Sequence, residues 1–453
     1  MMKNFAILAT LILMAFSSQA QPAKHVVLIS IDGLRPDFYQ DPSWNAINLR
    51  QLKENGVYAQ GVQSVFPSFT YPSHTAIITG ALPIRHGVYY NVYFEPFKAP
   101  GRWYWNESEI KVPTLWDAVG KAGLTSAAVH WPVSVGAPVT YNLPEVWAWP
   151  STKKVLLEEI AKNAHPAGLM EEVQQNATGR MEELDYNSYY LSADENMARI
   201  SGYLIRKYKP SLLAVHLTAV DHFEHEQGRD GDKVRRAVAS ADRAVRTILE
   251  SIERAGLTET TAVMIVGDHG FSDIHTALYP NIWLRDNGFA TPSQDGAEQQ
   301  WSALFHPCGG SAFLHLKNKN DKATLQKVKD ILNRLPEAQK RQFRIVDRKE
   351  LDSIGADPNA ALALAAVQGV SFSGSDKGKE SVRAAKGGTH GFFPDFKEIQ
   401  TGFIGYGAGF KKGAVLPVMG LQDIAPIVAT LLGIPFEAPD GILYPGILDL
   451  SKK

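Results

Sequence analysis

The sequence predicts an α/β fold, in which a doubly wound and mostly parallel sheet is flanked by helices on both faces. Several short runs are apolar at every position, as in strands that are buried on both faces of a parallel sheet. These runs alternate with amphipathic helical patterns, and three of them are followed by an aspartate. The chain has 453 residues, of which 45% are hydrophobic and 21% charged, so it can form a large core.

The first half of the chain supplies several elements of the predicted sheet. His25–Ile31 is a continuous apolar run that ends at Asp32, which predicts a strand buried inside the sheet. Further along we expect an amphipathic helix at 45–56, a helix after Thr70, an aromatic loop at 92–112, a helix opening at 112–119, a strand at 125–130 and charged helices at 151–208.

The second half repeats this pattern and adds an insertion. The runs 211–219 and 261–266 predict two more buried strands, ending at Asp221 and Asp268. A long amphipathic helix lies between them, with Gly256 as its C-cap. We expect a smaller inserted α+β subdomain at about 280–385, with a strand at 311–316 and a helix capped by Asp321, and then a strand at 401–409 and a helix at 421–432 closed by Gly433.

The N-terminus predicts export. Residues 1–20 have a basic start at Lys3, an apolar core and a small-residue ending, as in a signal peptide. The apolar core is about 12 residues long, short of the roughly 20 that span a bilayer, which disfavours the alternative of an uncleaved anchor. We therefore expect a signal peptide at 1–20 and a single domain at 21–453, located in the periplasm or secreted, with no membrane span after signal removal.

Charge and cysteine content argue against a nucleic-acid-binding protein and against a disulfide-stabilised one. The formal net charge is −1, so we expect no binding to nucleic acid polymers. Cys308 is the single cysteine, which excludes an intramolecular disulfide, and its setting predicts a buried hydrophobic role. The sequence predicts no particular oligomeric state.

Thr70 stands at a predicted helix start. It comes just before a Pro-containing first turn and an apolar run, which is typical of an N-cap. The first turn of a helix also presents free N–H groups and the positive end of the helix dipole, which favour an anion. Thr70 is therefore either an ordinary cap or a nucleophile held beside a bound phosphate.

Six potential metal ligands follow predicted strands or lie near them. Ligands of open α/β sheets bind at the carboxyl ends of the strands, where Asp32, Asp221 and Asp268 are expected. His225, His269 and His390 complete the set, and Asp with His suits zinc. The set suffices for two ions with open coordination positions. Two such ions can stabilise both the attacking and the leaving oxygen in a phosphoryl displacement. A structural zinc or calcium site is the alternative, but histidines disfavour calcium and the surplus of ligands disfavours one closed zinc site.

These motifs, in their order along the chain, resemble the nucleotide pyrophosphatase/phosphodiesterase family of the alkaline phosphatase superfamily. The resemblance spans residues 25 to about 435, and its motifs form a specific set. They are Ile31–Pro36, Pro67–His74, Thr79-Gly80, His86-Gly87, Asn91, Asp221 with His225, Gly267–Gly270 and Thr389–Gly391.

The resemblance implies an alkaline-phosphatase-like fold and a role for each matching residue. Thr70 would be the nucleophile that forms a covalent phospho-threonine, and Asn91 would donate to a phosphate oxygen. Two Zn²⁺ ions are implied, with a small-molecule phosphodiester or nucleotide as substrate and nucleoside 5′-monophosphate as product. The ligands of one ion would be Asp32, Asp268, His269 and Thr70, and those of the other would be Asp221, His225 and His390.

The chain departs from the family pattern at two positions. Glu224 stands where a glycine often precedes the second metal histidine, and Ser73 stands where asparagine is common. Neither change removes a ligand. Five other histidines near the motifs match no ligand position and are expected to be packed or to support the ligands: His74, His86, His130, His216 and His222.

Other activities are weaker interpretations of the same residues. Sulfatases need a Cys or Ser where this chain has Thr70. Monoesterases of the superfamily usually add Lys and Arg, whereas the corresponding stretch here, 130–134, has no cation. Other phosphodiesters, such as choline-type phospholipid head groups, remain open as substrates. The aromatic loop 93–105 either contacts the substrate or packs in the core. A metal-dependent binding protein without catalysis is disfavoured, because every expected position is filled.

Overall fold

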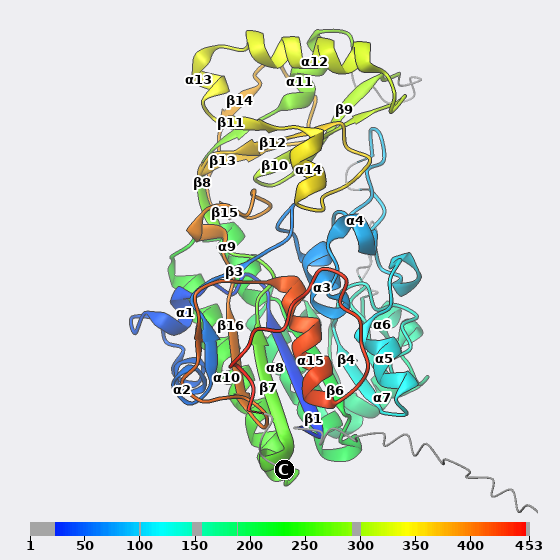
Figure 1. Cartoon of the computed structure of the whole chain (residues 1–453), viewed down its shortest axis with the longest axis vertical. Coiled ribbons are helices and arrows are strands. Elements are labelled where there is room, and N and C mark those ends of the chain that lie inside the picture. Colours follow the sequence, from blue (N-terminus) through cyan, green and yellow to red (C-terminus); the bar gives the residue numbers. More distant parts are fainter. Residues whose placement is uncertain (1–22, 99–100, 147–155, 188, 292–299, 450–453) are drawn as a thin grey trace, which may run out of the picture.

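A large central sheet organises the chain in the computed structural model, which describes residues 23–98, 101–146, 156–187, 189–291 and 300–449 (Figure 1). The sheet has eight strands in the order β17-β2-β16-β7-β1-β6-β4-β5. Its pairs are parallel except those of β16, which is antiparallel to β7 and β2. The strands are β1 (His25–Ile31), β2 (Val57–Ala59), β4 (Ser126–Val129), β5 (Tyr141–Leu143), β6 (Leu212–Leu217), β7 (Thr261–Val266), β16 (Phe403–Gly407) and β17 (Val415–Leu416).

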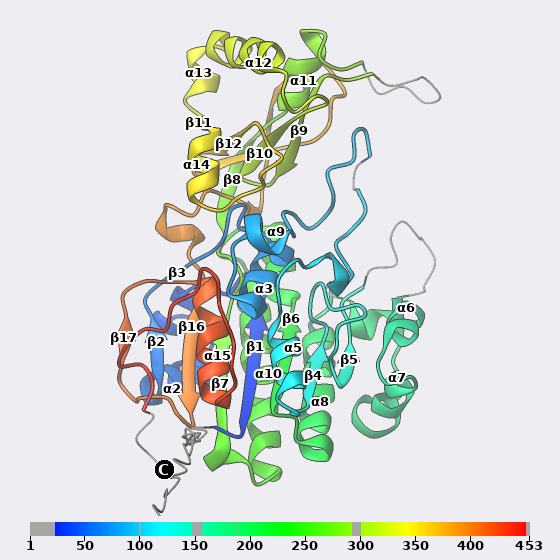
Figure 2. The same ribbon diagram turned by 45° about the vertical axis from the view of Figure 1, so that its right-hand side comes forward.

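Helices cover both faces of this sheet, as the doubly wound prediction requires. Successive side chains of a strand point to opposite faces, so Val27 and Ile29 of β1 join one buried cluster while Val26 and Leu28 join another. Figures 1 and 2 show the helices of the two clusters on opposite sides of the sheet. The first cluster includes α2 (Ile47–Asn55), α8 (Leu191–Tyr208) and α10 (Asp232–Arg254), and the second includes α3 (Thr70–Thr79), α5 (Leu115–Lys121) and α15 (Ile424–Leu432).

The central strands end together at one edge of the sheet. In the parallel register, Ser30 of β1 lies beside His216 of β6 on one side and Val266 of β7 on the other. The residues that follow these strands, Asp32 and Asp268 among them, therefore meet at the same edge.

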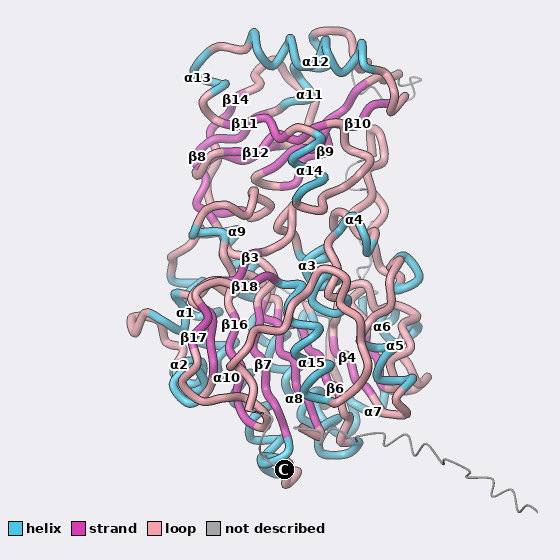
Figure 3. Tube along the Cα trace, viewed as in Figure 1, coloured by secondary structure: helices cyan, strands magenta, loops and turns pink. Residues whose placement is uncertain are grey.

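Above this edge stands a second group of elements (Figure 1). Figure 3 shows most of its strands, though not β8, running across the direction of the main strands. Its four-stranded antiparallel sheet has the order β11-β12-β10-β9, and β8 pairs with β13, β14 and β15. Because β8 begins before residue 280, the expected insertion at about 280–385 stays a prediction. The strands are β8 (Ser272–Leu278), β9 (Ala303–Cys308), β10 (Ser311–Leu316), β11 (Phe343–Val346), β12 (Leu362–Ala366), β13 (Gly369–Phe372), β14 (Val382–Ala384) and β15 (Gly388–Thr389).

Most predicted elements are present, with one notable difference. The strands predicted at 25–31, 261–266 and 311–316 match β1, β7 and β10, and the helix α12 (Lys322–Arg334) is capped by Asp321 as expected. The run 211–219 is not strand throughout. It ends as β6 at Leu217, and a separate helix α9 (Ala219–Gln227) follows, so Asp221 lies in a first helical turn rather than at the strand end.

The helix that begins at Thr70 corrects the predicted cap. Phe69, which is extended at φ −122° and ψ 154°, is the N-cap, and Thr70 is the first residue of α3. No side chain caps this helix, so the Thr70 hydroxyl is not used as a cap. Pro72 falls in the first turn, where a missing N–H costs no helical hydrogen bond.

The remaining elements connect these layers. Cys308 is buried, as predicted. The predicted signal peptide lies outside the described residues, and none of the helices within them is long and apolar enough to span a bilayer. The other helices and strands are α1 (Asp37–Gln40), β3 (Val62–Gln63), α4 (Pro83–His86), α6 (Leu156–Asn163), α7 (Leu169–Val173), α11 (Pro280–Asp286), α13 (Glu337–Lys340), α14 (Arg348–Ser353) and β18 (Met419–Gly420).

Candidate active site and metal centre

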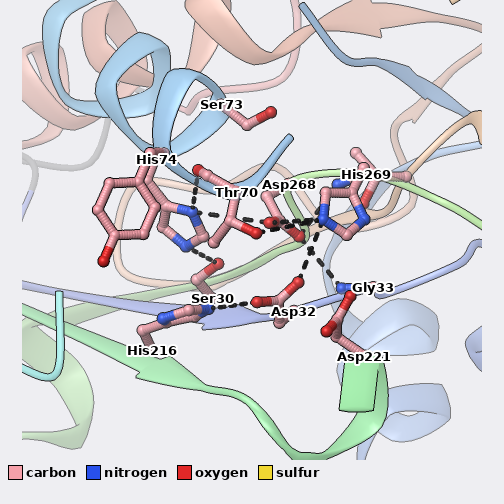
Figure 4. Close-up of polar contacts among 12 residues, drawn as sticks. Ser30, Asp32, Gly33, Thr70, Ser73, His74, His216, Asp221, Asp268 and His269 are labelled. Carbon is pink, nitrogen blue, oxygen red and sulfur yellow. Dashed lines mark hydrogen bonds and ion pairs between the residues drawn. The ribbon is translucent and has the colours of Figure 1, made fainter. Parts of the chain in front are cut away.

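Three predicted ligands gather at the ends of β1 and β7, and we call Asp32, Asp268 and His269 the inner group. The Nε2 atom of His269 lies 3.3 Å from Oδ1 of Asp32 and 3.2 Å from Oδ2 of Asp268. All three side chains are buried. Figure 4 shows them pointing toward one another from the strand ends, with Asp221 close by.

The other three predicted ligands, Asp221, His225 and His390, form the outer group. Asp221 and His225 lie one turn apart on α9, which brings His225 Nε2 to 3.4 Å from Asp221 Oδ1. His390, just after β15, places its Nε2 3.6 Å from the same oxygen. The ligand atoms of this group lie within 4.8 Å of one another, and so do those of Asp32, Asp221 and His269. The carboxylate of Asp221 is therefore also within reach of Asp32 and His269 in the inner group.

The carboxylates of both groups have buried oxygens without hydrogen-bond donors. Asp32 Oδ1, Asp221 Oδ1 and Asp268 Oδ2 are buried atoms that accept no hydrogen bond. A buried carboxylate oxygen without a donor is costly unless a cation neutralises it. These oxygens and the facing imidazole nitrogens are the donor types that zinc prefers. The residues thus fit a divalent metal centre.

The electrostatics of the metal-free site agree with this interpretation. Burial, followed by repulsion from Asp268 and Asp221, raises the pKa of Asp32 well above its usual range. Burial also raises the pKa of Asp268 to about 7 and that of Asp221 above its ordinary value. Burial and neighbouring histidines lower the pKa values of His269 and His390. A bound cation would reduce the repulsion between the buried carboxylates and would favour their ionised form, while the neutral imidazoles could bind the same cation.

Thr70 faces the inner group from the start of α3. Its Oγ1 lies 3.5 Å from Nε2 of His269, and its side chain is buried. As the first residue of a ten-residue helix, it stands where free backbone N–H groups favour an anion. The hydroxyl is thus close to both the ligand atoms and an anion-binding helix end.

Asn91 is held by the same helix start. Its Oδ1 accepts a hydrogen bond of 2.9 Å from the backbone N–H of Tyr71. Because this bond assigns the oxygen, the amide nitrogen is the atom that can donate to a bound oxyanion. Asn91 therefore lies at the site as a fixed donor.

A cavity of about 200 Å³ opens onto these residues. Tyr71 and Trp103 form an aromatic part of its wall, with ring centroids 5.2 Å apart. The predicted aromatic loop thus serves two purposes, since Trp103 lines the cavity while Tyr93 stacks on Tyr104 at 3.7 Å and Phe94 on His315 at 4.1 Å. The residues that line the cavity are Asp32, Thr70, Tyr71, Asn91, Trp103, Glu145, His216, Thr218, Asp221, His225 and His390.

His74 fixes the start of α3 to the sheet. Its Nδ1 donates to the carbonyl oxygen of Thr70 at 2.8 Å, and its Nε2 accepts from the hydroxyl of Ser30 at 2.8 Å (Figure 4). Burial and the neighbouring His216 lower the pKa of His74, in agreement with a neutral ring in this tautomer. This histidine supports Thr70, as the prediction of a supporting role requires.

The other histidines near the motifs that match no ligand position are also packed against neighbouring groups. His86 and His130 are buried, and His222 lies against the ring of Tyr189 at 4.3 Å. His216 differs, because it lines the cavity and contacts Asp32 directly, with 3.1 Å between Nε2 and Oδ2.

Glu145 is a cavity residue that the sequence analysis did not identify. It follows β5 and is buried, with Oε2 3.0 Å from Nδ1 of His216. A single carboxylate in a loop carries no motif or periodicity, so no sequence signal marks it. A signal for His216 exists: it is the polar member of the apolar strand β6, on the face that α3 covers.

The two departures from the family pattern lie beside the site. Glu224 is buried and forms an ion pair of 2.8 Å with Arg35, away from the outer ligands on the same helix. The hydroxyl of Ser73 lies 3.0 Å from that of Ser64, which in turn donates to the carbonyl oxygen of Asp268 at 2.7 Å. Both residues contact side chains beside the site, and neither replaces a ligand.

Comparison with known sequences gives one family and several relatives. The model of the family described as type I phosphodiesterase/nucleotide pyrophosphatase matches residues 26–393. Ectonucleotide pyrophosphatase/phosphodiesterase family member 7 of Rattus norvegicus is 22% identical over 460 residues, covering 95% of this chain and 88% of the relative. Family member 1 of the same species is 23% identical over 442 residues, covering 94% of this chain and 42% of the relative. The chain thus spans less than half the length of that second relative.

A solved structure has a similar fold. The chain resembles human ectonucleotide pyrophosphatase/phosphodiesterase 5 with a TM-score of 0.66 at 17% sequence identity, over 92% of this chain and 97% of that one. The expected α/β architecture, with its large and mostly parallel sheet, is therefore confirmed.

Proposed function

Because the chain belongs to the type I phosphodiesterase/nucleotide pyrophosphatase family, and is a hydrolase of that family, we propose that it is an exported two-zinc enzyme that cleaves phosphodiesters or phosphoanhydrides and releases nucleoside 5′-monophosphates. One observation supports this most strongly. Three buried carboxylate oxygens without hydrogen-bond donors converge beside the Thr70 hydroxyl at a helix start.

The inner and outer groups would each hold one zinc ion. Asp32, Asp268 and His269, with Thr70, would hold the first, and the outer group would hold the second. When bound, the two ions would supply positive charge that activates the nucleophile and stabilises the leaving oxygen. The mixture of Asp and His donors supports zinc rather than calcium.

Thr70 would carry the covalent step. Its Oγ1 forms a bond to phosphorus while the bond to the leaving alcohol or phosphate breaks, which gives a phospho-threonine. Water then attacks phosphorus and frees the hydroxyl. Asn91 would donate from its amide nitrogen to a non-bridging oxygen, and the backbone N–H groups of α3 would favour the same negative charge.

The cavity wall favours a diester over a monoester. A monoester carries more negative charge and usually needs additional cationic side chains, but among the described residues the lining of this cavity contains no Lys or Arg. The buried carboxylate of Glu145 also lines it, with Oε2 3.0 Å from Nδ1 of His216. Tyr71 and Trp103 offer an aromatic surface for the group beyond the phosphate, such as a nucleoside.

Chelation and removal of the nucleophile test the proposal together. The purified protein should hydrolyse p-nitrophenyl thymidine 5′-monophosphate, lose activity on chelation and regain it with added zinc. Thr70→Ala should remove activity, whereas Thr79→Ala, which removes another buried hydroxyl of α3, should keep it. Activity that survives chelation or Thr70→Ala would overturn the mechanism.

Substrate preference is tested separately. We expect faster hydrolysis of bis-p-nitrophenyl phosphate than of p-nitrophenyl phosphate. A faster monoester reaction would make the protein a monoesterase of the same superfamily, and activity on p-nitrophenylphosphorylcholine without activity on the thymidine ester would favour a phospholipid-type diesterase.

A further inference from the structure

A chain of three side chains leads from the interior to the inner group. Glu145 Oε2 lies 3.0 Å from Nδ1 of His216, and Nε2 of the same ring lies 3.1 Å from Oδ2 of Asp32. All three residues are buried. Figure 4 shows His216 beside Asp32, on the side opposite His269.

His216, which bridges Glu145 and Asp32, determines which oxygen of Asp32 faces the metal ligands. His216 engages Oδ2, while Oδ1 accepts no hydrogen bond and lies 3.3 Å from His269 Nε2. Without the bridge, the carboxylate could rotate about its terminal torsion, which is broad for aspartate. The contact with His216 thus aims one oxygen at the position of a ligand.

The ring of His216 is itself fixed at its other nitrogen. Glu145 Oε2 holds Nδ1, and Glu145 Oε1 accepts a hydrogen bond of 3.1 Å from the hydroxyl of Tyr71. Tyr71 directly follows Thr70 on α3, so the chain of contacts connects the nucleophile's helix with the metal ligand. Because both ring nitrogens are engaged with carboxylates, His216 does not have the geometry of a metal ligand in this arrangement.

We propose that His216, oriented by Glu145, is a positioning residue that sets the zinc affinity of the inner group by holding Asp32. The inference rests on the proposed two-zinc function. Partners that orient metal ligands typically change metal affinity about 10–100-fold when they are replaced. The effect belongs to the inner ion, because the hydrogen-bond contacts of His216 are with Asp32 and Glu145 and with no residue confined to the outer group.

Two amide substitutions, each of which keeps a polar atom near one ring-nitrogen position, separate this role from mere packing. His216→Gln places an amide nitrogen near the former Nε2 position, so it keeps a donor for Asp32. His216→Asn reaches only the former Nδ1 position, so it keeps a partner for Glu145 and loses Asp32. A packing role would lower zinc affinity only in step with the thermal stability of the metal-free protein, whereas a positioning role would lower it in His216→Asn beyond any loss of stability. His130→Asn is the matched control, because His130 is buried and its Nε2 lies 4.0 Å from Glu145 Oε2.

The experiment measures two zinc dissociation constants by competition with a chromophoric chelator, starting from metal-depleted full-length protein. The inner ligands are more buried than the outer ones, so we expect the inner ion to be the tighter one. We expect His216→Asn to weaken this ion about 10–100-fold, and His216→Gln and His130→Asn to weaken it less than about fivefold. Thermal melting of each metal-free protein checks that it is folded. If His216→Asn does not fold, Glu145→Ala replaces it, with about tenfold weaker binding expected.

The outcomes distinguish this inference from the proposed function. If the wild-type protein binds two zinc ions and the Asn and Gln variants bind the tighter ion equally well, His216 is not a positioning residue and only this inference is wrong. If the wild-type protein binds no zinc, the two-zinc function itself is wrong. Selective loss of the tighter ion in His216→Asn, with rescue in His216→Gln, supports both.

Discussion

The inner group lies directly after two buried strands, whereas the outer group is carried by helix α9 and by the segment that follows β15. Asp268 is fully buried, and its Oδ1 accepts hydrogen bonds from the backbone N–H groups of Gly33 at 3.1 Å and His269 at 3.0 Å. In the outer group, the side chain of His225 is 42% exposed, and its Nδ1 donates a hydrogen bond of 3.1 Å to the carbonyl oxygen of Gly388.

This difference indicates that the chain prepares the two sites unequally. The two inner carboxylates are fixed at the strand ends and by hydrogen bonds to their second oxygens, Oδ2 of Asp32 and Oδ1 of Asp268. The outer ligands come from separate elements that must stay in contact, so ordering them costs more conformational entropy. We therefore expect the inner ion to bind more tightly and the outer ion to exchange first.

The largest effect should come from the inner group. Asp268→Asn keeps the acceptor for Gly33 and His269 but replaces the free oxygen with an amide nitrogen, which cannot bind zinc. We expect a fall in kcat/KM of at least about 1000-fold, or roughly 4 kcal/mol of transition-state stabilisation. Asp242→Asn, which alters a buried aspartate between α2 and α10, is the control and should keep full activity. Activity of the Asp268 variant near the wild-type value would show that the inner group is not a metal site.

A ligand of the outer group should have a smaller effect that zinc reverses. His225→Asn removes an exposed ligand from α9, so we expect about 10–100-fold weaker binding of the second ion and recovery of activity at high zinc concentration. Zinc content and rate are measured together across a zinc titration. A loss that no zinc concentration restores, or a weaker inner ion instead, would break the distinction between the groups.

Acidification should lower the zinc affinity of the inner group by a smaller factor than these substitutions. In the metal-free protein, burial raises the pKa of Asp268 to about 7, so this carboxyl is mostly ionised at pH 8 and mostly protonated at pH 6. Zinc must then displace a proton, and affinity falls by about tenfold per pH unit for each proton displaced below that pKa. Chelator competition at pH 8, 7 and 6 measures this, and an affinity that does not change with pH would contradict it.

The smallest effect concerns the support beneath Thr70. Ser30→Ala removes the hydroxyl that donates to His74 Nε2 and leaves a buried nitrogen unsatisfied. We expect a loss of about 1–3 kcal/mol in the free energy of unfolding, measured by urea denaturation of the metal-free protein. Ser240→Ala, where the buried hydroxyl makes no hydrogen bond, should cost little. An equal loss in both variants would remove His74 from the account of how Thr70 is held.

The same contrast explains what the sequence could predict. Asp32 and Asp268 follow continuous apolar runs, so their position at the sheet edge follows from strand patterning alone. The contact of His390 with Asp221 depends on tertiary structure, and only the family resemblance suggested it. The separate helix α9 was missed because the apolar run continues past the end of β6 at Leu217.

Local rules also gave one incorrect role and missed one residue. Thr70 is a residue type that is typical of N-caps, but the extended Phe69 takes that position and Thr70 begins the helix. Glu145 has no local signal, because its partners Tyr71 and His216 are 74 and 71 residues away in sequence. Contacts of this kind are set by the packing of the sheet and are not encoded in spacing.

The covalent intermediate tests the central claim most directly. The enzyme is mixed with p-nitrophenyl thymidine 5′-monophosphate, quenched in acid within the first turnovers and digested for mass spectrometry. We predict a thymidine-monophosphate adduct on Thr70 that forms with the release of p-nitrophenol and is absent from Thr70→Ala. Release of p-nitrophenol in an early burst with no adduct on Thr70, or with the adduct on another residue, would contradict the account.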